Sequence, residues 1–166
     1  MVEIREIQNE SELEQSVSVI RQAFGSVAGE FHITQENNPT HASFITLERL
    51  LERGQRARFF GLYTNNLQAG FVAIEEGPGG TYYMEWLAVP PGLSHRGYGR
   101  QLTTFVLDYV KKNGGARVAL GMIDGHTVLK EWYKSLGFVQ TGTKKFEHLP
   151  FLVGFMEKAV SAEQVE

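Results

Sequence analysis

The sequence of 166 residues contains no cysteine, and this absence removes whole classes of chemistry. It excludes a disulfide framework, a thiolate nucleophile, iron–sulfur ligation and any zinc site with a cysteine ligand. Long apolar runs are also missing: the longest obvious one, 151–156, falls far short of the ~20 residues that a membrane helix needs. Four of the first ten residues are charged, where a secretion signal would have its apolar core. We therefore expect a cytoplasmic protein that binds no membrane.

A large excess of charge of one sign is absent too. The net charge of −3 disfavours a general nucleic-acid-binding surface, so no nucleic acid is expected as a partner. The charges are unevenly spread, however. Between Gly92 and Arg117 five basic residues accompany a single acid, Asp108, so this stretch carries a local charge of +4. A basic stretch within an acidic chain indicates an anionic ligand.

The composition is that of an ordinary globular domain, with 42% hydrophobic and 21% charged residues. A chain of this length forms one domain whose core needs no metal or disulfide to hold it. We expect this domain to span residues 1–158 and to be followed by a polar tail over 159–166.

Apolar periodicity and turn residues predict the element order β-α-α-β-β-β-α-β-α-β-β. The first helix is expected to be capped by Ser11 and to break at Gly25, which leaves a long polar loop as far as His41. The segment 81–123 is predicted to be a βαβ unit with two parallel neighbouring strands, surrounded by hairpins. The fold class is therefore α/β, with a mixed and mostly antiparallel sheet. Strands are predicted over 2–7, 57–64, 69–76, 81–89, 117–123, 138–146 and 151–158.

A turn rich in glycine and arginine, residues 94–100, joins a predicted strand to the best-defined helix. Unpaired amides and the helix dipole favour an anion at such a junction, and Gly97 and Gly99 let the backbone approach it closely. Arg96 and Arg100 add positive charge, so a diphosphate is the expected ligand. The alternative is a tight turn whose arginines are merely solvated. A Walker loop is excluded, because no Gly-Lys-Ser/Thr occurs.

Two local motifs, in this order, resemble those of one protein family. The first runs Leu87-Ala88-Val89-x-Pro91 and continues as Arg96-Gly97-Tyr98-Gly99-Arg100. It resembles the acetyl-CoA loop of the GNAT superfamily of N-acetyltransferases, although Ser94 stands where that family usually has Gln or Arg. The second, Tyr133-Lys-Ser-Leu-Gly-Phe138, is similar to the family's Tyr-x-x-x-Gly-Phe signature. The predicted element order fits the GNAT fold over residues 2–158.

The resemblance implies acetyl-CoA as the acetyl donor and no metal. The strand ending at Val89 would splay from its parallel neighbour and receive the acetyl-pantetheine arm through Leu87, Ala88 and Val89. His126 falls where the family often has an asparagine near the start of the next helix, and would also contact the cofactor. The residues expected to hold the diphosphate are Ser94, His95, Arg96, Gly97, Tyr98, Gly99 and Arg100.

Two residues are candidates for acid–base catalysis. By motif position Tyr133 would be the general acid that protonates the departing CoA thiolate; the alternative is a ring that only packs between helix and sheet. Glu85 is the leading general base, because a carboxylate in an otherwise apolar strand costs desolvation energy unless it is paired or used. It is expected on the same face as Leu87 and Val89, with a simple ion pair as the alternative. The second choices for the base are Glu75 and Glu76.

The long polar loop and the second helix are expected to wall the pocket for the acceptor, unless the loop is merely solvated. The candidate acceptor-binding residues are Glu30, Phe31, His32 and His41. Histidine and acidic residues do not cluster at metal-ligand spacing, so no metal site is expected. Trp86 and Trp132 are expected in the core rather than against a ligand.

These inferences favour an acetyl-CoA-dependent N-acetyltransferase that acts on a primary amine. Transfer would be direct, since no cysteine is present to form an acetyl-enzyme. The acceptor is a small-molecule amine or a peptide amine, and a polyamine, an amino acid, an antibiotic and a protein N-terminus all stay open. The alternatives are a non-catalytic acyl-CoA-binding module and, more remotely, a binder of nucleotide phosphates. The closing strands, 138–158, have aromatic-rich edges that suit a homodimer.

Overall fold

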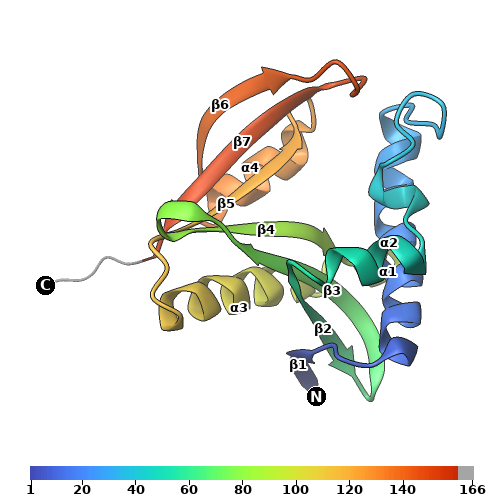
Figure 1. Ribbon diagram of the computed structural model, residues 1–166, viewed down its shortest axis with the longest axis vertical. Helices are drawn as coiled ribbons and strands as arrows, with labels where there is room; N and C mark the ends of the chain where they lie inside the picture. The colour runs from blue at the N-terminus through green and yellow to red at the C-terminus, as the bar shows by residue number, and fades with distance from the viewer. Residues whose placement is uncertain (161–166) are drawn as a thin grey trace, which may run out of the picture.

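The computed structural model describes residues 1–160, in which seven strands form one twisted sheet flanked by four helices (Figure 1). The strands are β1 (Val2–Glu6), β2 (Arg58–Thr64), β3 (Leu67–Glu76), β4 (Thr81–Ala88), β5 (Arg117–Ile123), β6 (Val139–Lys145) and β7 (Leu152–Ala159). The helices are α1 (Glu10–Glu30), α2 (Leu47–Arg53), α3 (Tyr98–Lys112) and α4 (Thr127–Ser135). Apart from three short 3₁₀ turns, the element order is the predicted one, and the mixed α/β fold class is confirmed.

The first four strands form an antiparallel meander, and the sheet order is β1-β2-β3-β4-β5-β7-β6. Asn65 and Asn66 make the tight turn between β2 and β3, with φ angles of 50° and 65°. Asparagine tolerates this left-handed backbone better than most residues, and a turn of this kind matches the twist of a hairpin.

Strands β4 and β5 are the two parallel neighbours of the predicted βαβ unit, with α3 as the crossover. They pair only at their beginnings, where Thr81–Tyr83 lies beside Arg117–Ala119. Beyond these residues the two strands diverge. Strand β7 then pairs with the other edge of β5, and β6 is the edge strand on that side of the sheet. The divergence leaves an opening in the middle of the sheet.

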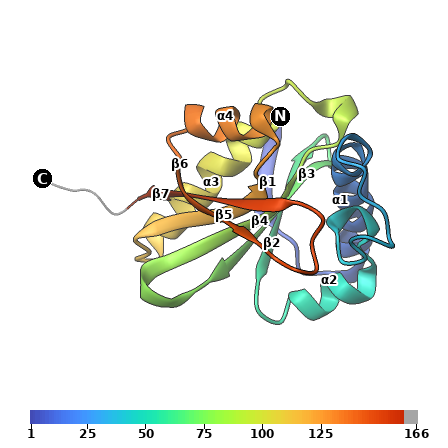
Figure 2. The ribbon, with the colours of Figure 1, turned by 90° about the horizontal axis from the view of Figure 1, so that it is seen from above.

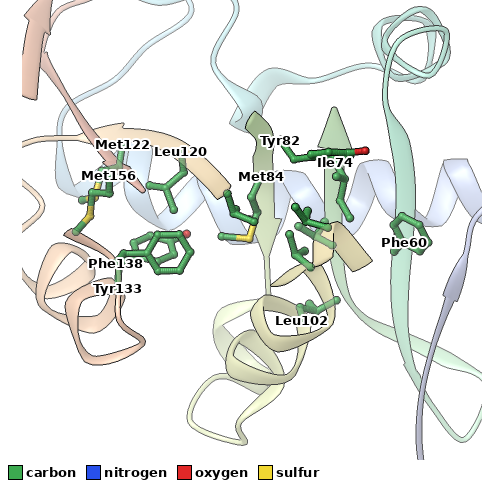
Figure 3. Close-up of a cluster of buried hydrophobic side chains, with 14 of the residues drawn as sticks. Phe60, Ile74, Tyr82, Met84, Leu102, Leu120, Met122, Tyr133, Phe138 and Met156 are labelled. Carbon is green, nitrogen blue, oxygen red and sulfur yellow. The ribbon is translucent and has the colours of Figure 1, made fainter. Parts of the chain in front are cut away.

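The two faces of the sheet carry separate hydrophobic clusters. Helices α3 and α4 cover one face, and α1 and α2 cover the other (Figure 2). Beneath α3 and α4, Leu102, Val106 and Val110 are fully buried at the spacing of one helix face, in the same cluster as strand residues that include Leu120 and Met156 (Figure 3). A smaller cluster beneath α1 and α2 forms the second part of the core.

Helix α1 differs from the prediction at both ends. It runs through Gly25 to Glu30 instead of breaking, because Ile20 and Ala28 keep one side of it in the core. Gly25 itself faces solvent, where glycine costs a helix only about 1 kcal/mol relative to alanine. The N-cap is Asn9 rather than Ser11, since the Asn9 side chain accepts the amide hydrogen of the third helical residue at 2.8 Å. The polar loop is correspondingly shorter.

Three findings concern the C-terminal tail, membrane-spanning helices and metal-binding groups. The predicted tail begins inside β7, which extends to Ala159, and residues 161–166 lie outside the described part of the chain. Within residues 1–160, no helix has both the length and the apolar character needed to cross a membrane. The same residues contain no group of three or more histidine and acidic side chains arranged to hold a metal ion.

Candidate active site

An irregularity in strand β4 opens the sheet. Glu85 and Ala88 of β4 pair with Ala73 and Phe71 of β3, so three steps along β4 match two along β3. The extra residue is a β-bulge, and Trp86 within it has a φ of 54°. An aromatic residue in this left-handed conformation is strained, and strain of this kind concentrates at functional sites. A bulged strand bends, which accounts for the departure of β4 from β5.

The bulge also decides which way the side chains of β4 face. Leu87 and Val89 pack with the cluster beneath α3 and α4, whereas Trp86 packs with the cluster beneath α1 and α2. Simple alternation predicted that Glu85 shares a face with Leu87 and Val89, and this prediction is wrong. The extra residue reverses the alternation, so that the carboxylate of Glu85 faces α2.

A cavity of about 960 Å³ lies between β4 and β5. On one face of the sheet it is lined by Leu129 and Tyr133 of α4, and on the other by Phe24 of α1 and Arg53 of α2. The cavity therefore passes between the diverging strands and connects the two faces. The side of α3 and α4 is called the donor half below, and the side of α1 and α2 the acceptor half.

The turn over residues 94–100 leads into the N-terminus of α3. Gly97 is the N-cap, with a φ of 83°, and no side chain caps the helix. The backbone amides of 97–100 donate no hydrogen bond to another residue of the described chain, so they are available to a ligand. Arg96 and Arg100 are exposed beside them. Free amides, helix dipole and two guanidinium groups together suit an anion.

Trp132 of α4 supports this turn from the side. A Cβ atom built on Gly99 would lie 3.3 Å from the Trp132 ring, so glycine permits a closer approach of α3 to α4 than a larger residue would. The Trp132 ring is half-buried at the edge of the core rather than within it. The contact of Trp132 with Gly99 therefore holds α4, the helix that carries Tyr133, beside the turn.

The side chain of Tyr133 is buried where α4 meets the sheet, beside Phe138 (Figure 3). Its ring centroid lies 5.0 Å from that of Trp132 and 5.5 Å from that of Phe138. Burial raises the pKa of the Tyr133 hydroxyl above its usual value near 10, so this group keeps its proton at neutral pH. Because Tyr133 also lines the cavity, it is a protonated group on the donor half.

Glu85 is held by an ion pair with Arg53, the last residue of α2. The same guanidinium contacts Glu75 of β3 at 2.6 Å and lies 5.8 Å from the centroid of the Trp86 ring. Arg56 is largely exposed and approaches Glu75 only to 4.0 Å. The ion pair that the sequence offered as an alternative role for Glu85 is therefore present. The partly buried guanidinium of Arg53 contacts two carboxylates.

Comparison with known proteins assigns a family to this arrangement. A family model described as the acetyltransferase (GNAT) family matches residues 21–138, a range that contains both sequence motifs and the bulged strand. The chain belongs to the GNAT acetyltransferase family. The family and the enzyme class predicted from the motifs are thus confirmed. No curated protein sequence matches the chain.

Solved structures with low sequence identity share this GNAT fold. The ribosomal-protein-S18-alanine N-acetyltransferase of Escherichia coli is 18% identical, with a TM-score of 0.78 over 99% of this chain and 97% of that one. The PaiA N-acetyltransferase of Thermoplasma acidophilum, solved in complex with coenzyme A, is 20% identical, with a TM-score of 0.73 over 96% and 99% of the two chains. A GNAT acetyltransferase of Staphylococcus aureus is 18% identical, with a TM-score of 0.72 over 97% and 100%.

In this GNAT fold the predicted acceptor residues are only partly brought together. His41 lines the cavity, whereas Glu30, Phe31 and His32 lie outside its lining. Burial lowers the pKa of His41, so the ring is neutral at pH 7. Its Nδ1 atom accepts the backbone amide hydrogen of Ser43 at 3.2 Å, which leaves the ring hydrogen on Nε2.

His126 was predicted to contact the cofactor, and it lines the cavity at the start of α4. Its Nδ1 atom lies 3.5 Å from the backbone nitrogen of Leu129, where it caps the helix weakly. The His126 ring lies 5.2 Å from that of Phe31. His126 therefore links α4 to the loop that follows α1.

Four residues of the cavity carried no clear signal in the sequence. Arg53 is an ordinary helix-ending arginine until α2 is placed over β4, and Trp86 was expected in the core. Phe24 and Asn38 also line the acceptor half, although Asn38 is only 3% exposed. Long-range packing brings these residues together, so no local sequence pattern could identify them.

Proposed function

We propose that this GNAT protein transfers the acetyl group of acetyl-CoA directly to the nitrogen of a primary amine. The observation that carries the proposal is the cavity between β4 and β5, because it joins Tyr133 on one face of the sheet to Glu85 on the other. Family membership supports acetyl transfer. The coenzyme A complex of the Thermoplasma protein, which has the same fold, supports the donor.

The residues present fit acetyl-CoA. Its diphosphate suits the free amides of 97–100 and the guanidinium groups of Arg96 and Arg100. Beyond Tyr83, β4 has no ladder with β5 in the described chain, so the edge near Leu87 keeps backbone groups for the thioester arm. When bound, acetyl-CoA supplies an activated acyl group that an amine can attack.

Tyr133 and Glu85 divide the proton transfers between the two halves of the cavity. The Tyr133 hydroxyl holds its proton on the donor half and can deliver it to the leaving sulfur. Glu85, paired with Arg53, can hold the acceptor's ammonium and receive its proton, directly or through a water molecule. Glu75 shares the same arginine and assists by adding negative charge.

The residues available support direct transfer. The chain has no cysteine to carry the acetyl group, and the cavity reaches both faces of the sheet, so that donor and acceptor can be bound together. We therefore expect initial rates measured against both substrates to give intersecting rather than parallel double-reciprocal plots. Holding two reactants in one cavity also removes most of the entropic cost of their encounter.

The test is the release of free CoA thiol when amines are added to the protein and acetyl-CoA. Tyr133→Phe and Glu85→Gln are each expected to lower kcat by about a hundredfold or more, the usual range for a missing acid or base. Glu76→Gln is the matched control: Glu76 ends the neighbouring strand, is exposed and does not line the cavity, so this variant keeps the wild-type rate.

Three outcomes would contradict the proposal or part of it. Binding of CoA in calorimetry without thiol release for any amine would make the protein a non-catalytic acyl-CoA-binding module. Wild-type rates in Glu85→Gln would remove Glu85 from the chemistry. Displacement of acetyl-CoA by equimolar ATP would favour a nucleotide-binding role for the glycine-rich turn.

A further inference from the structure

The walls of the acceptor half are mainly apolar and aromatic. Phe24 and Trp86 line the cavity and pack with the cluster beneath α1 and α2. Val27 and Phe151 line it as well, and they pack with a third cluster between the end of α1 and the end of β5. Three aromatic rings, from α1, from β4 and from the residue before β7, therefore line the cavity that Glu85 also lines. Such walls favour a flat apolar body in the ligand.

The charges near Glu85 leave room for one cation. Glu75 and Glu85 share the guanidinium of Arg53, so these three groups sum to one negative charge. Arg56 lies 4.0 Å from Glu75 but is largely exposed, so water screens its charge. Arg53 is 18% exposed and already occupied by both carboxylates. A single ammonium beside Glu85 would neutralise the cluster. A second ammonium nearby would meet Arg53, and like charges in a partly desolvated site repel strongly.

Among the described residues, one other carboxylate lines the cavity, that of Glu157 on β7. Strand pairing sets Tyr83 of β4, Ala119 of β5 and Glu157 of β7 in one row across the sheet. Two strand spacings separate the ends of this row, roughly 10 Å. The two ammonium groups of a diamine could pair with these two carboxylates, and this gives the inference its sharpest alternative.

The polar groups at the other end of the acceptor half are uncharged donors. Asn38 is 3% exposed; its Oδ1 accepts the Thr40 hydroxyl at 3.3 Å, while its Nδ2 donates to no residue of the described chain. His41 is neutral and presents the hydrogen on Nε2. Both line the cavity. Such donors suit a hydroxyl or carbonyl oxygen and disfavour a second ammonium.

We infer that the acceptor is a monoamine, with one primary ammonium held at Glu85, an aromatic body between Phe24 and Trp86, and an uncharged oxygen facing Asn38 and His41. This inference rests on the proposed acetyl transfer and narrows its acceptor. Arylethylamines such as tyramine have this chemistry. Polyamines and aminoglycosides, which carry several ammonium groups, do not.

The experiment compares kcat/KM for five amines with acetyl-CoA at saturation: tyramine, 2-phenylethylamine, ethylamine, putrescine and spermidine. Tyramine is expected to exceed putrescine and spermidine by about a hundredfold, because neither of these has an aromatic body to contact Phe24 and Trp86 and a second ammonium beside Glu85 would meet Arg53. Phe24→Ala is expected to lower kcat/KM for tyramine by about tenfold and that for ethylamine by less than about twofold, since ethylamine has no aromatic body to lose contact. Leu67→Ala is the control, because this exposed leucine lies in a distant hairpin and does not line the cavity.

The possible results separate the inference from the function on which it rests. Putrescine or spermidine reacting as fast as tyramine overturns the inference and leaves acetyl transfer standing, and a further loss of their rate in Glu157→Gln would identify the diamine site. Faster acetylation of a peptide N-terminus than of tyramine also overturns it. If Phe24→Ala lowers kcat/KM equally for tyramine and ethylamine and leaves the melting temperature unchanged, Phe24 does not contact an aromatic part of the acceptor. If none of these amines releases thiol, the proposed function fails and the inference falls with it.

Discussion

Replacing Tyr133 by phenylalanine removes one hydroxyl and keeps the ring. The ring centroids of Trp132 and Phe138, 5.0 and 5.5 Å away, remain in contact with the new side chain. The hydroxyl has no hydrogen-bond partner in the described chain, so its loss should change the free energy of unfolding by less than about 1 kcal/mol. The chemical step, by contrast, loses its proton donor. A hundredfold to ten-thousandfold fall in kcat corresponds to about 3 to 5 kcal/mol of barrier.

The assay is thiol release at saturating acetyl-CoA and amine, from pH 6 to pH 9, beside a thermal melt of the same sample. Burial raises the pKa of Tyr133, so its hydroxyl stays protonated throughout this range and contributes no alkaline limb to the wild-type profile. Tyr109→Phe is the control, since Tyr109 of α3 does not line the cavity and its hydroxyl accepts a hydrogen bond from Arg58 instead. A Tyr133→Phe rate within twofold of the wild type would refute the acid role. An alkaline limb below pH 9 that disappears in Tyr133→Phe would refute its raised pKa.

Three further predictions concern the backbone and stability. Gly97→Ala forces alanine into a φ of 83°, so it should lower the free energy of unfolding by about 1 to 2 kcal/mol and weaken CoA binding. Gly25→Ala lies in an exposed helical turn with free space around it, so it should raise the free energy of unfolding by up to about 1 kcal/mol. Equal effects of the two variants in thermal melts would contradict both predictions. Asn9→Ala removes the N-cap of α1 and should lower the free energy of unfolding by about 1 kcal/mol in urea titrations, while an unchanged midpoint would argue against the cap. Burial raises the pKa of Tyr63 from 10.0 to about 12, so stability should fall as pH rises from 10 to 12, where the unfolded chain loses this proton first. Tyr63→Phe should flatten that fall, and an identical pH slope in denaturant titrations would contradict the assignment.

Most of the fold could be predicted because its signals are local. Helix α3 shows an apolar spacing that matches its buried face, and the paired asparagines at 65 and 66 mark their turn directly. The break expected at Gly25 failed for a tertiary reason: Ala28 is buried beyond it, and this packing outweighs the low helix propensity of glycine.

The site could be predicted only where its residues belong to motifs. The amides and arginines of 94–100 are contiguous, and Tyr133 precedes a Gly-Phe pair, so both could be recognised in the sequence. The face of the sheet to which Glu85 points could not be predicted, because it depends on the bulge at Trp86. Strict alternation along a strand does not foresee an inserted residue. Arg53 reaches Glu85 from a helix more than thirty residues earlier, and only the assembled sheet brings the two side chains together.

The central claim is that the opening between β4 and β5 binds acetyl-CoA with its reactive end at Tyr133 and Glu85. A crystal structure with CoA bound tests it most directly. The account predicts that the diphosphate lies on the amides of 97–100 and that the thiol lies between β4 and β5, near the Tyr133 hydroxyl. A CoA molecule bound elsewhere, or one whose thiol points away from the cavity, would contradict it.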